Sequence, residues 1–337
     1  MTGPGRYLAR RLLQFPPTVL ATLFALHYLT ALGIQLNGNP ARAVFGDRVP
    51  TAAQLAAAAR RLGTDDPCFA RVGDPCLPVF GTRLRHLLAG DLGTDVRGRD
   101  VLAAVGDAAP VTLRLALLAF AVNAAAGLTA GVLAGARRGR AADRLVRVGA
   151  AALVAVPPFL LGALAQFGLG VRLGRWLDGQ PWAPQFLGDV FTVAFRPGHP
   201  WLSLVVPATV LGALAAAVTA RVTRSAVAAN LGADHVRTAA AKGLGRARVV
   251  RAHALRNCLV PVVTHLGSDV TALLGGAVVV EGVFNVPGAG RLVFTAVADG
   301  DAPVVIAAAT IALLVHLVVN LAVDLLYPVL DPRIGHG

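Results

Sequence analysis

The sequence predicts an all-α membrane protein with six transmembrane helices and a sizeable external segment between the first two helices. Of its 337 residues 55% are hydrophobic and only 15% are charged, and the mean hydropathy is +0.65. Soluble globular chains carry about 25% charged residues, so the composition argues against a soluble enzyme and against disorder. The formal net charge of +13 belongs outside the bilayer, because Arg and Lys are costly at its centre. Nucleic-acid binding explains that charge poorly, since the chain is so apolar.

Each predicted span rests on a stretch of mostly apolar residues, of which a spanning helix needs about 20. The first stretch follows three arginines, as a signal peptide would. However, it is longer than a signal peptide's apolar region and lacks a small-residue cleavage site, so we expect a retained span. The third stretch contains Pro157-Pro158, which predicts a kink. The six spans are expected over residues 12–34, 111–134, 148–171, 202–220, 259–280 and 304–327.

The charge of the loops predicts the orientation of these spans, because cytoplasmic loops carry an excess of Lys and Arg. The N-terminal tail together with residues 137–147 and 221–256 has a net charge of +14, whereas residues 35–110, 172–203 and 281–303 sum to zero. We therefore expect a multi-pass protein of the plasma membrane with both termini in the cytoplasm. Its expected parts are a cytoplasmic N-terminus with the first helix (1–34), an external segment (35–110), a core of five helices (111–330) with a cytoplasmic loop (221–258), and a cytoplasmic tail (331–337).

The external segment is long enough to have structure of its own. Thr51 to Leu62 predicts a helix, because a capping Thr is followed by Gln54 three residues later and by an Ala-rich run. Cys68 and Cys76 lie in the same segment, where an exported compartment permits either a disulfide or two unpaired thiols. No CxxC pair is present, so the cysteines predict no metal site.

The cytoplasmic loop between the fourth and fifth spans contains the pattern most informative about function. Residues 233–244 have helical periodicity that Gly243 interrupts, and a second, Arg-rich amphipathic stretch follows. Two interpretations fit this pattern. The segment either lies on anionic lipid or docks into the groove of a soluble partner, since its small Ala side chains permit a close approach.

This loop resembles that of ABC-importer permeases of the dipeptide and oligopeptide branch. VRTAAAKGL (236–244) followed by HALRN (253–257) is similar to the family's VRTARAKGL and HALRN, although Ala240 and Gly245 depart from the usual Arg and Ser. Further segments resemble the family in order along the chain: ARRLLQ (9–14), GNPARA (38–43), LLAGDLGTDVRGRDV (87–101), ADRLVRV (142–148), VPPFLLG (156–162), GGAVVVEGVFNVPGAGRLVFTAV (275–297) and VNLAVDLLYPVLDPRI (319–334).

The resemblance implies a type I ABC importer permease fold. It further implies a second homologous permease subunit, two ATPase subunits or domains, an external substrate-binding protein and a peptide substrate. ATP and Mg would lie on the partner ATPases, because this chain has no GxxxxGK[ST] loop; we expect it to be no enzyme and to bind no cofactor or metal itself. The ATPase contact is expected at Val236, Arg237, Thr238, Ala239, Ala241, Lys242, Gly243 and Leu244.

Polar residues within the predicted spans are candidates for the substrate path. Those in the fifth and second spans are Thr264, His265, Ser268, Asp269 and Asn123. His265 and Asp269 are four residues apart and share a helical face, which fits either a strip facing the translocation cavity or a pair that only supports packing. Glu281 matches the family's VVVE and is expected to cap or to pair with Arg291, at a gate or in packing.

Two other classes of membrane protein compete with an importer. A membrane enzyme is disfavoured because no HExxH, GxSxG or carboxylate cluster appears. A secondary transporter is disfavoured because no internal repeat is evident and the docking segment would have no role. Within the resembling family, nickel chelates, haem and glycosides are alternatives to peptides.

Overall fold

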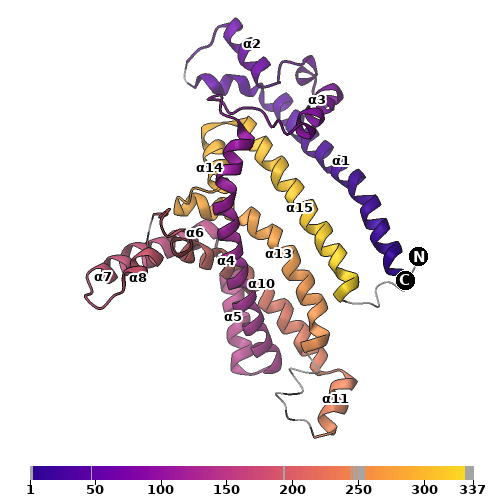
Figure 1. Cartoon of the computed structure of the whole chain (residues 1–337), viewed down its shortest axis with the longest axis vertical. Helices are drawn as coiled ribbons and strands as arrows, with labels where there is room; N and C mark the ends of the chain where they lie inside the picture. Colours follow the sequence, from indigo (N-terminus) through magenta and orange to yellow (C-terminus); the bar gives the residue numbers. More distant parts are fainter. Residues whose placement is uncertain are drawn as a thin grey trace. The chain divides into compact units, whose positions relative to one another are not determined.

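The described chain is helical almost throughout. The computed structural model describes residues 3–330, apart from residues 47, 193, 244, 246–247 and 249–254. Among these residues the one β pairing is an isolated antiparallel bridge between Thr94 and Asp100. The elements (Figure 1) are α1 Gly3–Asn37, η1 Pro40–Phe45, α2 Ala52–Arg61, η2 Pro67–Ala70, α3 Leu77–Leu88, α4 Val101–Ala136, α5 Ala141–Ala155, α6 Pro158–Ala165, a π-helix Gln166–Leu173, α7 Gly174–Asp178, α8 Gln185–Val190, α9 Pro200–Ser203, α10 Val205–Leu231, α11 Asp234–Ala241, α13 Leu255–Phe284, α14 Ala289–Asp299 and α15 Ala302–Leu330.

Among the described residues, five helices are long and apolar enough to cross a membrane. They are Leu8–Asn37, Val101–Ala136, Val205–Leu231, Pro261–Phe284 and Ala302–Leu325, and a bent pair of helices supplies a sixth span if it is counted as one crossing. The prediction of an all-α membrane protein is confirmed. The second span differs from its predicted start, because α4 begins ten residues before Val111 and so includes the end of the predicted external segment.

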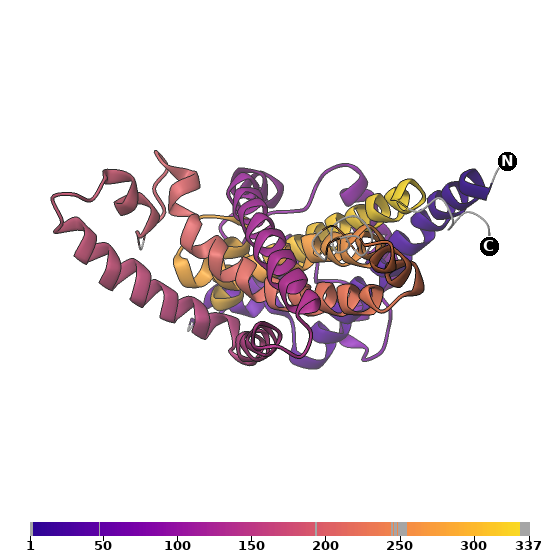
Figure 2. The same ribbon diagram turned by 90° about the horizontal axis from the view of Figure 1, so that it is seen from below.

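The third predicted span is not one helix. The expected span over 148–171 divides into α5 and α6, which meet at an angle of 100°. Pro158 has no N–H to continue the hydrogen bonds of α5, whereas the first turn of α6 needs no such donor. The kink predicted at the Pro pair is therefore corrected to a complete break. Figure 2 shows α6, the π-helix and α7 running on as one rod that turns back into α8.

The chain forms two compact units. The first combines residues 1–110 with 288–321, and the second combines residues 111–287 with 322–337. The division of the chain into the parts predicted from its sequence stays a prediction.

The second unit is built on a close contact between α4 and α10. Gly127, Gly131 and Gly135 follow one another at four-residue spacing along one face of α4. A Cβ atom at Gly131 would lie 2.5 Å from the Cβ of Thr223 and 2.8 Å from the carbonyl oxygen of Ala220. Only glycine permits this approach, as at the small-residue contacts of membrane helices generally.

An apolar core adjoins this contact in the second unit. Leu115 and Ala119 of α4 pack with Val210 and Leu211 of α10 and with residues of α13 such as Ala277. Leu115, Ala119 and Ala277 have no exposed surface. The core thereby joins α4, α10 and α13, which are also the helices that carry most of the predicted site residues.

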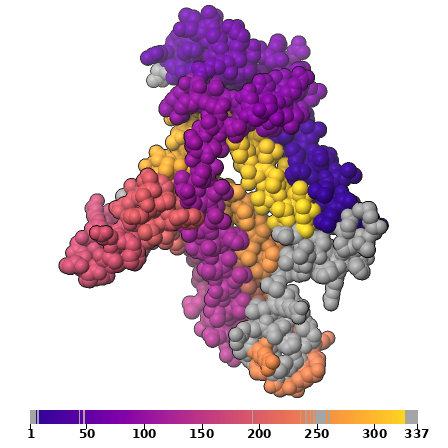
Figure 3. All heavy atoms as spheres, in the orientation of Figure 1, coloured from indigo at the N-terminus to yellow at the C-terminus, as the bar shows by residue number. Residues whose placement is uncertain are grey.

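In the first unit, the segment between α1 and α4 (residues 38–100, here the α1–α4 segment) has the local structure that its sequence predicts. Thr51 caps α2, and its side chain and that of Gln54 each accept from the other's backbone N–H, which confirms the predicted helix. A disulfide joins Cys68 and Cys76, and these cysteines pack with Phe69 and with Ala31 of α1. In Figure 3 this segment, coloured indigo to purple, forms one closely packed body.

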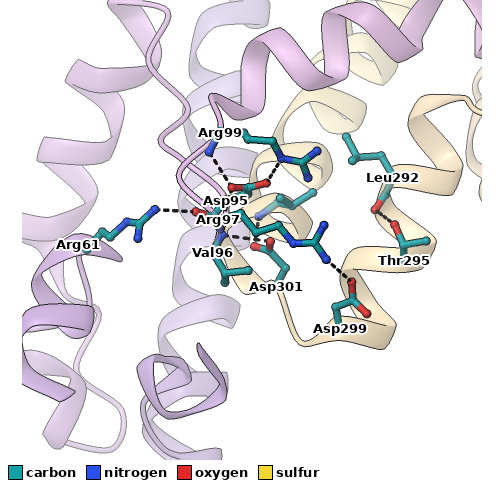
Figure 4. Close-up of polar contacts among 10 residues, drawn as sticks. Arg61, Asp95, Val96, Arg97, Arg99, Leu292, Thr295, Asp299 and Asp301 are labelled. Carbon is teal, nitrogen blue, oxygen red and sulfur yellow. Dashed lines mark hydrogen bonds and ion pairs between the residues drawn. The ribbon is translucent and has the colours of Figure 1, made fainter. Parts of the chain in front are cut away.

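A tight turn at residues 95–99 completes the α1–α4 segment (Figure 4). The carboxylate of Asp95 accepts hydrogen bonds from the backbone N–H groups of Arg97 and Arg99, and Arg99 Nε donates to it over 2.7 Å. Asp301, which lies just before α15, accepts from the backbone N–H of Val96 over 3.2 Å. Asp299 lies 3.9 Å from the guanidinium of Arg97. The turn is therefore attached to the residues that connect α14 and α15.

Candidate functional site

The predicted ATPase contact, here the coupling segment (Val236–Leu244), lies on and just after α11. Only Gly232 and Ala233 separate α11 from the end of α10. Val236 is buried, whereas the side chains of Arg237, Thr238, Ala241 and Lys242 are exposed. A short helix with one buried anchor and an exposed remainder is available for contact with another protein.

The end of the coupling segment has the geometry that its sequence predicts. Gly243 has a φ of +80°, the left-handed conformation that glycine adopts most easily after a helix. Lys242 still donates its backbone N–H to the carbonyl of Thr238, so the helical bonding ends immediately before this glycine. Two predicted members are not fully covered: Leu244 lies outside the described residues, and so does the side chain of Ala239.

The coupling segment begins where two long helices of the second unit meet. Near the end of α10, Asn230 Nδ2 donates to the backbone carbonyl of Ala226 and lies 3.4 Å from the sulfur of Cys258 near the start of α13. Cys258 is buried. A displacement of α11 would therefore act directly on α10 and on its contact with α13.

A buried carboxylate links the other predicted cytoplasmic loop to α10. Asp143, at the start of α5, is 1% exposed and accepts two hydrogen bonds from Arg224, from Nε at 2.9 Å and Nη2 at 3.1 Å. It also accepts from the backbone N–H of Gly139. Such two-pronged Arg–carboxylate pairs fix orientation as well as contributing energy. Nothing in the sequence near Asp143 indicates that Arg224, 81 residues away, is its partner.

Three of the polar residues predicted for the substrate path come together at Asp269. The carboxylate of Asp269 accepts from Asn123 Nδ2 over 2.8 Å and from Thr219 Oγ1 over 3.0 Å. His265 Nε2 lies 3.5 Å away. Asp269 is 8% exposed, and Asn123 and Thr219 have no exposed surface. The carboxylate thus connects α4, α10 and α13, which corresponds to the packing interpretation of this residue.

The other two substrate-path candidates have different surroundings. Ser268 is exposed, and its hydroxyl donates to the backbone carbonyl of Thr264 on its own helix. Thr219 was absent from the sequence-based candidates, since a lone Thr in an apolar span carries no signal of its own. The four-residue spacing of glycines on α4, in contrast, is a recognisable signature of a close helix contact, and it could have pointed to the neighbourhood of Thr219.

Glu281 and Arg291 fall in different units of the structure. The side chain of Glu281 is fully buried near the end of α13, and its backbone carbonyl accepts from the N–H of Val286. Arg291 is half-buried on α14. The pairing of Glu281 with Arg291 stays a prediction.

Comparison with known proteins gives one family and several full-length relatives. Residues 127–336 match the model of the family described as binding-protein-dependent transport system inner membrane component. The chain is 34% identical over 331 residues to a glutathione transport system permease protein of Salmonella typhimurium, covering 98% of this chain and 99% of the relative. It is 30% identical over 349 residues to a dipeptide transport system permease protein of Alkalihalophilus pseudofirmus, with the same coverage.

Proposed function

Because this chain belongs to the family of binding-protein-dependent transport system inner membrane components, we propose that it forms the translocation path for small peptides in an ATP-driven importer. It is a permease subunit, and its full-length relatives are named for glutathione and dipeptide transport. Both substrates are short peptides. These two names favour a peptide over a nickel chelate, haem or a glycoside.

The coupling segment is proposed to carry the movement of the ATPases into the membrane helices. The observation that supports this role most directly is the position of α11, an exposed helix anchored by Val236 at the end of α10. A push on α11 would move α10 relative to α4, to α13 through Asn230, and to the loop held by Asp143. All three partners would then respond to one docking event.

The partners follow from what this chain lacks and from what its family name implies. ATP hydrolysis is assigned to two separate ATPase subunits or domains, since the sequence has no phosphate-binding GxxxxGK[ST] loop. An external binding protein would deliver the peptide. A second permease subunit would complete the path, because the single chain leaves much of its spans uncovered. Only 22% of the most apolar stretch of α1 and 11% of that of α15 are buried.

The orientation of the chain is proposed from its charges. The coupling segment must face the ATPases, and it lies within the most basic of the loops, residues 221–256. That assignment places the N-terminus and the C-terminal tail in the cytoplasm and the α1–α4 segment outside.

A bulky substitution in the coupling segment tests the proposed contact. Ala241 is exposed at the end of α11, and Ala141 is similarly exposed at the start of α5. We expect Ala241→Trp to abolish copurification of the ATPase subunits and peptide uptake, because the added indole would keep the two surfaces apart. Ala141→Trp is the matched control and should leave both unchanged.

The outcome separates the coupling role from the substrate class. If the ATPases bind Ala241→Trp as well as they bind the wild type, the proposed contact is wrong. Uptake of labelled glutathione and dipeptides by the wild-type complex in vesicles, measured beside nickel chelates, haem and a glycoside, tests the substrate. Uptake restricted to a non-peptide would overturn the peptide assignment alone.

A further inference from the structure

A cavity of about 560 Å³ opens in the first unit, lined by α1, α3, α15 and the end of α2. Its volume falls in the range of about 300–1,000 Å³ typical of sites for small molecules. One side of the cavity is apolar and is formed by two candidate membrane spans. Leu23, Leu26 and Ile34 of α1 line it together with Ile306 and Ala307 of α15.

The apolar side of the cavity lies at one end of both spans. The α1 residues are in the second half of the span Leu8–Asn37, and the α15 residues are in the first turns of the span Ala302–Leu325. The end of one candidate span and the beginning of the other therefore line the same cavity. Near the ends of a span the hydrocarbon of a membrane gives way to its headgroup region.

Basic residues also line the cavity. They are Arg60 and Arg61 from the end of α2, and Arg83 and His86 from α3. Asp91 is the one acidic residue among the described lining residues, and it is engaged with His86 Nδ1 at 2.7 Å. The cavity thus has an excess of positive charge, and part of it lies beside the apolar residues, since Arg83 contacts His27 of α1.

Arg83 is the cation least able to be satisfied by water. Its side chain is half-buried, and burial lowers the pKa of its guanidinium. Its one described polar contact is with the ring of His27, where Arg83 Nη1 lies 3.4 Å from Nδ1. No carboxylate in the described part of the chain forms an ion pair with it. A partly buried cation without a counter-ion is unfavourable, and a bound anion would relieve that cost.

We propose that this cavity binds an anionic phospholipid, with the phosphate at Arg83 and an acyl chain along Leu26 and Ile306. A phospholipid matches both the basic and the apolar residues of the cavity at once, because it joins an anionic headgroup to a hydrocarbon chain. Basic pockets between membrane helices bind anionic headgroups in this way. A free anion would leave the apolar wall uncovered, and a zwitterionic lipid would bring a second cation into a cavity that already has an excess of positive charge.

The experiment titrates lipids against the full chain in detergent, with bound lipid counted by native mass spectrometry. We expect phosphatidylglycerol to bind about tenfold more tightly than phosphatidylcholine, because the choline cation of the latter is repelled by the basic residues of the cavity; a charge near a cationic surface contributes about 1 kcal/mol. Arg83→Gln should remove that preference. Arg85→Gln is the matched control, since Arg85 is exposed on the same helix and does not line the cavity.

Three further measurements keep the proposal open to refutation if Arg83→Gln fails to fold. Ile306→Trp would fill the apolar side and should weaken phosphatidylglycerol binding, while exposed Arg60→Gln should lower the preference for it over phosphatidylcholine. Glycerophosphate, which has the headgroup chemistry without acyl chains, should not compete. The proposal would be overturned if glycerophosphate competed as well as phosphatidylglycerol itself, or if Ile306→Trp bound phosphatidylglycerol as tightly as the wild type. It would also be overturned if Arg83→Gln and Arg85→Gln lowered the lipid preference equally.

Discussion

The buried carboxylates of the second unit and of the α1–α4 segment differ in the range of the hydrogen bonds that they accept. In the second unit, Asp269 accepts hydrogen bonds from residues 50 and 146 positions away. In the α1–α4 segment, Thr51 and Gln54 are three positions apart, Asp95 and Arg99 four, and the disulfide joins residues separated by eight. The carboxylates of Asp269 and Asp95 are both buried, but only the second finds its donors within its own turn.

This difference follows from the solvent of each region. A spanning helix satisfies its own backbone groups, so its remaining polar side chains must find partners on other helices. A loop in water has backbone N–H groups that are not used by a helix, and a nearby Asp side chain can accept hydrogen bonds from them. Substitutions in the two regions should therefore differ in how far their effects spread.

The largest effect is expected where α4 meets α10. Gly131→Leu would force a branched side chain against the Thr223 Cβ and the Ala220 carbonyl, and overpacking of this severity costs roughly 3 kcal/mol or more. Gly106→Leu, in the same helix, is the control, since a Cβ there meets nothing within 4 Å. Thermal unfolding in detergent should show a large loss of stability for Gly131→Leu only. Comparable losses for both would mean that the α4–α10 contact is looser than described.

Loss of the disulfide should have the next largest effect, confined to the α1–α4 segment. The loop between Cys68 and Cys76 is short, and loop-closure entropy assigns about 2.5 kcal/mol to such a cross-link. Replacing both cysteines by serine should speed proteolysis of this segment while membrane-helix unfolding stays the same. A parallel fall in the unfolding temperature of the second unit would contradict the separation of the two regions.

A smaller effect is expected at Asp269. Asp269→Ala would leave Asn123 and Thr219 without their acceptor, and hydrogen bonds between membrane helices contribute about 0.6 kcal/mol each, up to about 1.7. Asp269→Ala should lower the free energy of unfolding by about 1–2 kcal/mol. Asp269→Asn keeps an acceptor oxygen and should lower it less. Uptake of peptides that differ in charge provides the second measurement. A change in charge selectivity without a loss of stability would favour the substrate-path interpretation over packing.

The smallest effect should depend on pH and belongs to Asp95. Burial raises the pKa of its carboxyl, but the backbone N–H and guanidinium of Arg99 outweigh this, and the pKa lies below the ordinary 3.8. The stabilisation from the ionised form is therefore complete above that value and is lost as the pH falls through the lowered pKa.

Asp95→Asn tests this sign directly. It should cost less than about 1 kcal/mol, since Arg99 is exposed and solvent screens the pair. Amide exchange at Arg97 and Arg99 should differ between wild type and variant near pH 5 and converge at lower pH. A difference that persists unchanged down to pH 2 would show that ionisation of Asp95 is not its cause.

The same contrast in range explains which features the sequence predicts. The helix capped by Thr51, the turn at Gly243 and the apolar spans depend on residues close together in the chain, and each was predicted at or near its observed place. The pairing of Asp143 with Arg224 and the cluster around Asp269 depend on how helices pack, which periodicity does not specify. The break after α5 was predicted only as a kink, because a Pro pair marks where a helix is interrupted but not the angle between its parts.

That break also affects whether the chain crosses the membrane an even or an odd number of times. An even number of crossings returns the C-terminus to the side on which the N-terminus began, and an odd number leaves the two ends in different compartments. Five helices in the described part of the chain are long and apolar enough to cross singly, and α5 with the rod that follows Pro158 makes the count even only if this bent pair crosses once. The bend at two adjacent prolines thus bears on the compartment of residue 337, which is 179 residues after Pro158.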